Sequence, residues 1–379
     1  MTTWAFFLYL SADNGQSKEV AMLPIPMAYD TLQGHLCQVL SGVPGIRIPQ
    51  IRNLALGVWG LVKARSCHLG KVADQLPSDG SKPSRICRLK RFLMNPRILI
   101  DAIYGQIVQK ILERWHRDYL TLAVDRTDWE AFNILFVGIP FVGRTIPLAW
   151  KVLDPQGNSS FQEQKALLEK ILPWIPAHMK VGLLRDREFR SVELIRSVQS
   201  LGWDFGLGQA EDTYVILARG RRCQLRDLKT KPGQVRFFEE VCLTDFHLFG
   251  PVPLICYWDR EKKEARFMAT NLPAVHRPFR WGKSRSWIEG TFRDYKSQGF
   301  DLEAPRLVHA DRLQKLLLVI AVAYVWMYHV GRWALRTGRR KQLDAASKRS
   351  FSFFRLGLDW ITQAISRFQP IEVGFAPYS

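Results

Sequence analysis

Apolar and polar positions along the chain predict helices first, then a sheet-forming middle, then a long apolar helix. The runs "YLTLAVDRTDW" and "AFNILFVGIPFVGRTIPLAWKVL" are β-branched and aromatic and are broken by glycine and proline, which is typical of neighbouring buried strands. A helical pattern at 161–175 precedes another buried run that ends at Asp186 and a helix that ends at Gly202. This alternation predicts an α/β fold with a mixed sheet.

The second half of the chain changes its pattern twice. Short alternating runs from about residue 205 to residue 273 predict a β-rich insertion, and helical periodicity returns near Ser284. The longest apolar run, Leu316 to Met327, is shorter than the roughly 18–20 residues of a membrane span, so we expect a buried core helix. The first residues have an apolar stretch without a basic region before it, so we expect no signal peptide and a cytoplasmic location.

The charge balance points to a polyanionic partner. Lys and Arg number 54 against 35 Asp and Glu, a formal net charge of +19. Such an excess favours nucleic acid, because each neutralised phosphate releases condensed counterions. The segment 81–97 carries six basic residues and no acid, including Arg88, Lys90 and Arg91. We expect this helix to contact the DNA backbone, although a solvated helix face has the same composition.

Cysteine and histidine spacing argues against a zinc site. The six cysteines form no C-x-x-C pair, and the eight histidines do not cluster at ligand spacing. Disulfides are not expected in a chain of this length, so we expect reduced thiols.

Carboxylates are the candidate metal ligands. Asp125 and Asp186 each close an apolar run, and open α/β sheets place ligands at the carboxyl ends of their strands. Two such aspartates on adjacent strands, with Glu289 on a facing helix, would supply the oxygen ligands that Mg²⁺ requires. A helix cap for Asp125 and a surface salt bridge for Asp186 are the plainer alternatives.

Arg285, Glu289 and Lys296 follow one another at intervals of four and seven residues. In a helix these intervals are about one and two turns, which places all three side chains on one face. An ion-pair ladder on a surface helix would need nothing more. The alternative is a metal-binding carboxylate flanked by two phosphate-binding cations.

Four segments in order, "LAVDRTDW", "LLRDREF", "ATNLP" and "RSWIEGTFRDYKSQGFDLE", resemble the IS4-type DDE transposases of bacterial insertion sequences. The resemblance extends from "RICRLKRFLMNP" to the long helix near the C-terminus. It implies an RNase H-like catalytic core with a β-rich insertion, a helical N-terminal domain and a helical C-terminal region. By residue number the implied division is 1–115 basic DNA-end-binding helices, 116–204 first part of the core, 205–280 insertion, 281–336 final part of the core, and 337–379 basic tail.

The resemblance also implies a reaction. Asp125, Asp186 and Glu289 would be the catalytic triad and would bind two Mg²⁺ ions, with Mn²⁺ as a substitute, for cleavage at transposon ends and strand transfer. Arg285 and Lys296 would bind phosphate. The partners would be double-stranded DNA, both terminal inverted repeats and target, and a second copy of the chain in a homodimer, with no membrane.

Tryptophans near these acids are candidates for stacking on a flipped base. Trp129 lies close in sequence to Asp125, and Trp281 and Trp287 lie close to Glu289. A packed core position explains each of these tryptophans equally well.

The chain departs from the family's helix signature at one element. The signature is Tyr, two residues, Arg, three residues, Glu, six residues, Lys, and Gly282 stands where the Tyr is expected. Ser286 follows the Arg in place of the usual Trp, which is displaced to Trp287. These departures favour a catalytically decayed DNA-binding protein as an alternative. Another two-metal nuclease or integrase is a separate alternative, which cleavage without end joining would favour.

Overall fold

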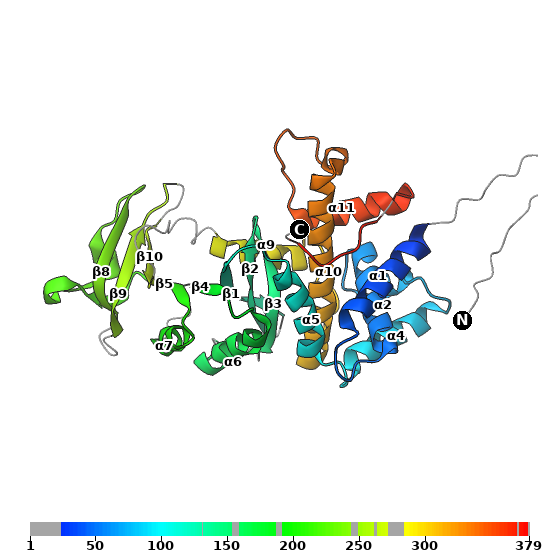
Figure 1. Ribbon diagram of the computed structural model, residues 1–379, viewed down its shortest axis with the longest axis horizontal. Helices are drawn as coiled ribbons and strands as arrows, with labels where there is room; N and C mark the ends of the chain where they lie inside the picture. The colour runs from blue at the N-terminus through cyan, green and yellow to red at the C-terminus, as the bar shows by residue number, and fades with distance from the viewer. Residues whose placement is uncertain are drawn as a thin grey trace, which may run out of the picture.

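The computed structural model of the chain describes residues 24–130, 132–153, 159–186, 192–243, 249–260, 264–271, 284–369 and 371–377. Helices occupy one end of an elongated molecule, and a mixed sheet runs from its middle to the other end (Figure 1). The sequence-based expectation of a mixed α/β fold flanked by helices is confirmed at this level.

The N-terminal part of the described chain consists of helices. Their bounds are α1 Pro24–Leu40, α2 Ile48–Ala64, α3 Leu69–Asp74, α4 Lys82–Met94 and α5 Ile100–Glu113. Ser81 caps α4, because its side chain accepts a hydrogen bond from the Ser84 backbone N–H. The buried face of α4 holds Leu89, Phe92 and Leu93, so Arg88, Lys90 and Arg91 remain on the outside.

Ten strands form one sheet in the order β3-β2-β1-β4-β5-β10-β9-β8-β6-β7. Strands β1, β4 and β5 are parallel, and the other pairs are antiparallel. The bounds are β1 Tyr119–Trp129, β2 Phe132–Phe141, β3 Arg144–Leu153, β4 Lys180–Arg185, β5 Asp204–Gln209, β6 Tyr214–Ile216, β7 Arg222–Gln224, β8 Val235–Leu243, β9 Phe249–Tyr257 and β10 Arg266–Thr270. The strands expected in a β-rich insertion thus continue the sheet of the first strands.

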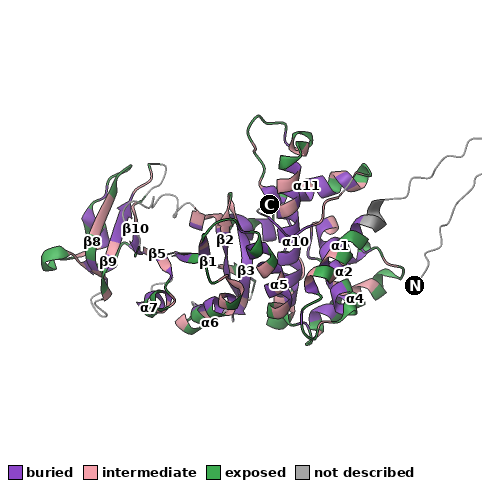
Figure 2. Cartoon of the chain, viewed as in Figure 1, coloured by how far each residue is buried: buried purple, intermediate pink, exposed green. Residues whose placement is uncertain are grey.

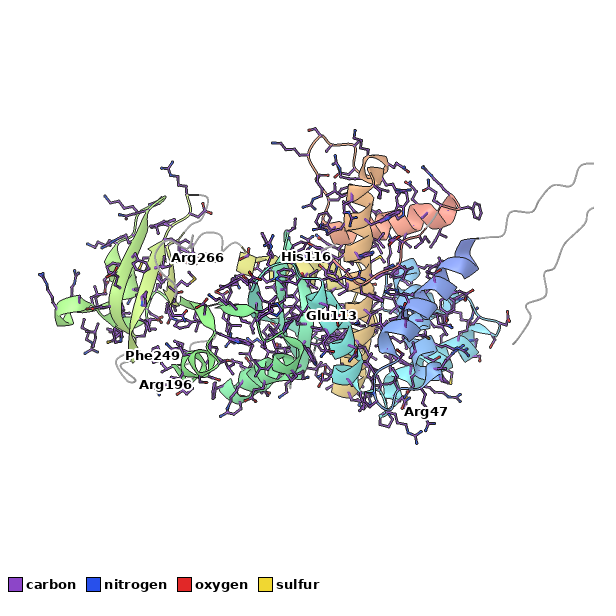
Figure 3. The ribbon with its side chains drawn as sticks, in the orientation of Figure 1. Arg47, Glu113, His116, Arg196, Phe249 and Arg266 are labelled. Atoms are coloured by element: carbon purple, nitrogen blue, oxygen red, sulfur yellow. The ribbon has the colours of Figure 1, made fainter. Side chains whose placement is uncertain are left out.

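Short helical elements connect the strands. They are α6 Phe161–Ile171, η1 Leu172–Trp174, α7 Val192–Ser200, η2 Ala218–Gly220 and η3 Leu225–Leu228. The guanidinium of Arg196 on α7 lies 5.8 Å from the centre of the Phe249 ring on β9, which joins this helix to the far part of the sheet (Figure 3).

Helix α10, Ala310–Arg336, lies between the sheet and the N-terminal helices and contacts β3, α2, α4 and α5 (Figure 1). It is long and apolar enough to cross a membrane, but 89% of its most apolar window is buried inside the protein (Figure 2). A helix that is apolar on all sides needs such a surrounding, and the expected core helix is confirmed.

The segment expected as a basic tail is folded against α10. After η4, Arg339–Gln342, the helix α11, Phe353–Ser366, crosses α10 at two glycines. A Cβ at Gly331 would lie 1.9 Å from the Phe353 carbonyl oxygen, and one at Gly357 would lie 1.9 Å from that of Met327. The two backbones touch only because both side chains are hydrogen atoms.

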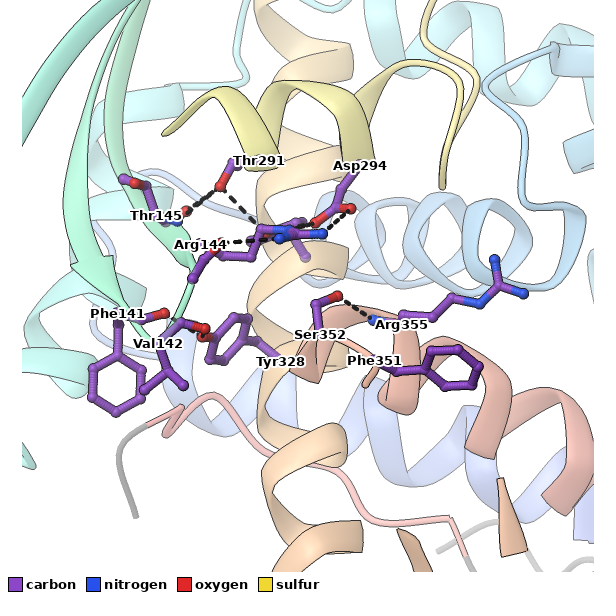
Figure 4. A network of polar contacts seen from close by, with 12 residues as sticks. Phe141, Val142, Arg144, Thr145, Thr291, Asp294, Tyr328, Phe351, Ser352 and Arg355 are labelled. Atoms are coloured by element: carbon purple, nitrogen blue, oxygen red, sulfur yellow. Dashed lines mark hydrogen bonds and ion pairs between the residues drawn. The ribbon is translucent and has the colours of Figure 1, made fainter. Parts of the chain in front are cut away.

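A buried ion pair fixes helix α9, Trp287–Tyr295, to the start of β3 (Figure 4). The Arg144 guanidinium donates to both carboxylate oxygens of Asp294, Nε at 2.5 Å and Nη2 at 3.2 Å. The Tyr324 hydroxyl on α10 also donates to Asp294 Oδ2, at 3.1 Å. Burial raises the pKa of Asp294, and the hydrogen bonds from Arg144 oppose that rise.

Replacing Arg144 with Met should lower the free energy of unfolding by about 3 kcal/mol, because it leaves a buried carboxylate without its partner. Urea denaturation measures this loss. Lys110→Met is the matched control, since it breaks an exposed pair with Glu113 and should cost at most about 1 kcal/mol. Equal losses in the two variants would contradict the role assigned to the Arg144–Asp294 pair.

Asp344 closes the loop before α11 and should make stability depend on pH in acid. Its carboxylate accepts hydrogen bonds from the Ser350 backbone N–H and hydroxyl, both at 2.8 Å. These bonds lower the pKa of Asp344 to about 2. The stabilisation is present above the unfolded value of 3.8 and is lost as the pH falls toward 2.

Asp344→Asn should therefore melt below wild type at pH 7, and the gap should close between about pH 4 and about pH 2. Thermal melts followed by circular dichroism over this range provide the measurement. A gap that stays constant with pH would show that the charge of Asp344 is not involved.

Candidate functional site

The register of two parallel strands brings Asp125 and Asp186 side by side. Val124 on β1 lies opposite Arg185 on β4, the last paired position, so the aspartate that follows each of them lies at the same height. Successive side chains point to opposite faces, and Arg185 reaches Gln164 on α6. Both aspartates therefore point to the other face, toward α9.

The expectation that Asp125 ends its strand is wrong, because β1 continues to Trp129 by pairing with β2. The pairing of β1 with β4 ends at Val124, directly before Asp125. The aspartate still lies at an edge, since the long β1–β2 ribbon extends beyond the shorter neighbouring strand.

One guanidinium contacts all three predicted acids. Arg285 Nη1 lies 3.2 Å from Asp125 Oδ2 and 3.0 Å from Asp186 Oδ2, and its Nη2 lies 3.0 Å from Glu289 Oε1. The Arg285 side chain is 10% exposed, whereas that of Glu289 is 56% exposed. The acids thus converge from β1, from the end of β4 and from α9 on a buried cation.

Burial dominates the electrostatics of Asp125. It raises the pKa of Asp125 to about 6, against the opposing effects of Arg285 and of the Arg126 backbone N–H, which donates to Oδ1 at 2.8 Å. A second guanidinium, that of Arg185, is buried on the opposite face of the sheet, where desolvation lowers its pKa to about 9 and the charge of Asp125 opposes that shift. Asp125 therefore lies in the field of two buried arginines.

The donor set suits a hard divalent cation. Three carboxylates from separate elements provide the oxygen ligands that Mg²⁺ and Mn²⁺ prefer. The Arg285 guanidinium occupies the position between them where a metal ion would bind. Within the described residues, no three His, Cys, Asp or Glu side chains approach closely enough to hold a metal ion in this arrangement. The carboxylates meet the guanidinium and not one another, so metal binding would require Arg285 to leave.

Lys296 does not share the helix face of Glu289. Helix α9 ends at Tyr295, and Lys296 is its C-cap residue with a non-helical backbone. Its Nζ donates to the Asp128 carbonyl oxygen at 2.6 Å and lies 3.8 Å from Glu303. The expected single helix through all three charged residues is therefore wrong at both ends, since α9 also begins at Trp287, after Arg285; Arg285 and Glu289 still pair four residues apart.

The tryptophans lie in different surroundings. Trp129 is 1% exposed, donates its indole N–H to the Leu302 carbonyl oxygen at 2.9 Å and stacks on Phe132. In this arrangement its ring is not available to a DNA base, so the core alternative holds for Trp129. Trp287 is half-buried at the start of α9, and Trp281 lies outside the described residues, as does Gly282.

The basic residues expected on α4 are solvent-facing. Arg88, Lys90 and Arg91 are exposed. Arg88 also donates to Asn53 Oδ1 on α2 at 2.7 Å, which gives it a structural contact between the two helices. Lys90 and Arg91 are left as the clearer candidates for binding an anionic partner.

Three charged residues that position the site escaped the sequence-based prediction. Arg144 and Asp294 hold α9 in place, and Arg185 lies behind Asp125. For Arg144 and Arg185 the available signal was their position within apolar runs, as for Arg185 in "KVGLLR"; Asp294 lies in a polar stretch that carries no such signal. A charged residue in such a run is costly unless it is paired, which makes it a candidate for a buried contact.

A cavity of about 110 Å³ opens beside the acids, lined by Asp186, Arg285, Gly206, Tyr257 and Met268 among others. It lies where β4 and β5 meet β9 and β10, so Arg285 borders both the carboxylates and this space. The cavity gives the candidate site a concave neighbour large enough for a small group such as a phosphate.

No protein-family model and no curated protein matches the sequence. Among solved structures, the chain is similar to one in a cryo-EM structure of a piggyBac transposase synaptic complex with hairpin DNA. That match has a TM-score of 0.44 and 9% sequence identity, and it covers 93% of this chain and 87% of the other. The similarity is to a DDE transposase and lends no support to the IS4 type in particular; at this level neither residues nor activity transfer to this chain.

Proposed function

We propose that this chain is a DDE-type DNA transposase, which cleaves phosphodiester bonds at the ends of a DNA element and joins those ends to target DNA. One observation carries the proposal: Asp125, Asp186 and Glu289, from three separate elements, surround one cation at a sheet edge. Carboxylates in such a set hold the divalent ions of enzymes that transfer phosphoryl groups.

Each of these residues would have a role that follows from its chemistry. The three carboxylates would hold two Mg²⁺ or Mn²⁺ ions, which supply Lewis-acid stabilisation of the attacking and leaving oxygens. The planar fork of Arg285 would bind a phosphate oxygen pair once it leaves the carboxylates. Lys296 caps the C-terminal end of α9, the helix that carries Glu289, and its charge would attract the DNA backbone.

The rest of the chain would support this reaction. Strands β1 to β4 with α9 and α10 would form an RNase H-like core of the IS4 type, and the strands from β5 onward would be its insertion. The helical end with exposed Lys90 and Arg91 would bind terminal inverted repeats. Two ends must be brought together for joining, so the protein would act as a homodimer on DNA. It would work in the bacterial cytoplasm, where the nucleoid is accessible.

A DNA-binding protein without catalysis is the second candidate. The observation that favours it is the guanidinium lodged among the acids, which excludes metal from them in this arrangement. The two candidates differ in one outcome, since both bind DNA and only the transposase cuts it.

Glu289→Gln should slow end cleavage by roughly three orders of magnitude, as expected for losing one electrostatic contributor to a transition state. The assay uses a plasmid with a marker between the terminal repeats that flank the gene, in the presence of Mg²⁺ or Mn²⁺. Binding of the variant to the same repeats should remain.

Glu303→Gln is the matched control, because Glu303 is exposed nearby and pairs weakly with Lys296, at 3.8 Å. It should excise the marker as wild type does. Binding of the repeats without cutting by wild type would favour the non-catalytic candidate.

Replacing both Lys90 and Arg91 with Gln should weaken DNA binding and reduce the slope of log K against log salt by about 2, because each cation that no longer neutralises a phosphate lowers the slope by about 1. Fluorescence anisotropy on a duplex of the terminal repeat measures both effects. The pair Lys110→Gln and Lys165→Gln removes the same charge from exposed positions on α5 and α6 and should leave the slope unchanged. An equal drop in this control would assign the effect to net charge and not to α4.

A further inference from the structure

We infer that Arg285 is an internal cation that keeps the acidic site closed to metal until a DNA phosphate draws it away. The inference rests on the proposed function and specifies how its site is regulated. Metal ion and guanidinium compete for the same carboxylate oxygens, while carboxylates and phosphate compete for the same guanidinium.

The contacts support a resting state held by this one side chain. A single positive charge serves three carboxylates, at 3.2, 3.0 and 3.0 Å. These contacts use both terminal nitrogens of Arg285. Opposite charges at hydrogen-bond distance in a partly buried site attract each other more strongly than they would in water, so a metal ion must displace the guanidinium to reach the carboxylates.

A cavity lies next to Arg285, into which its side chain could move. Arg285 lines the cavity of about 110 Å³ that lies beside Asp186 and Tyr257, so the residue borders open space as well as the acids. Its buried Nε–H has no hydrogen-bond partner among the described residues. A phosphate oxygen would satisfy that donor, since guanidinium binds phosphate through parallel N–H donors.

Helix α9 can stay in place while Arg285 moves. Arg285 precedes the first residue of α9, whereas Asp294 near its other end is held by Arg144 and Tyr324. The exchange therefore needs a rotamer change and not the release of the helix that carries Glu289.

Thermodynamic linkage follows from the two competitions. Phosphate that binds Arg285 uncovers the carboxylates and so raises their affinity for a divalent cation, and the cation raises the affinity for phosphate by the same factor. Metal loading is thereby favoured in protein that already holds DNA over protein that does not.

The experiment measures Mn²⁺ binding to the full-length chain by electron paramagnetic resonance, with and without the terminal-repeat duplex. Without DNA, Arg285→Gln should bind Mn²⁺ at least about tenfold more tightly than wild type, within the usual range of coupling factors. Wild type should tighten when DNA is added, and Arg285→Gln should tighten much less. Arg285→Lys, which keeps the charge but not the fork, should fall between them.

Arg293→Gln separates displacement of Arg285 from general charge removal, because Arg293 is exposed on α9, the helix that carries Glu289. An equal gain in Mn²⁺ affinity for Arg293→Gln would overturn the inference. So would unchanged or weaker Mn²⁺ binding by folded Arg285→Gln, or by Arg285→Lys if the Gln variant does not fold. Adding Asp125→Asn to Arg285→Gln should abolish the gain, which locates the ion at these acids.

Plasmid cleavage and Mn²⁺ binding together distinguish an error about Arg285 from an error about the proposed function. If wild type cuts plasmid DNA but Arg285→Gln gains no Mn²⁺ affinity, the resting role of Arg285 is wrong and the transposase proposal stands. If wild type binds DNA, does not cut it and takes up no Mn²⁺ with DNA present, the proposed function fails and this inference fails with it.

Discussion

Negative charge gathered at one sheet edge has to be balanced, and this constraint organises the middle of the molecule. The parallel register of β1 and β4 places Asp125 beside Asp186, and Glu289 approaches them from α9. Three carboxylates around a partly buried space repel one another, which opposes the docking of the helix that carries the third. The Arg285 guanidinium offsets that repulsion, so the same side chain neutralises the site and allows α9 to dock.

The two ends of α9 are held in different ways. Near its C-terminal end, Asp294 receives a bidentate guanidinium and a tyrosine hydroxyl in the core, so breaking these contacts exposes a buried charge. Ahead of its N-terminal end, Arg285 borders a cavity and contacts an exposed Glu289. One end is therefore suited to fixing the helix, and the other to exchanging partners.

Sequence reasoning failed where a charged or aromatic residue took its role from a distant partner. Arg144 and Asp294 are 150 positions apart, and no local pattern links them. Trp129 lies beside acidic residues in the sequence, but its indole is enclosed by Phe132 and by the segment at Leu302. Lys296 fits a helical spacing that the chain does not follow, because α9 ends one residue earlier.

The sequence by itself determined the α/β alternation, the buried helix that ends at Arg336 and the choice of three acids and one arginine as a set. Periodicity and apolar runs report burial directly, because side-chain direction repeats with the backbone period. Only the tertiary structure decided that Asp125 and Asp186 share a height on the sheet and that one guanidinium reaches them both together with Glu289. Register and ion pairing depend on distances between segments far apart in the chain, which no local pattern of residues encodes.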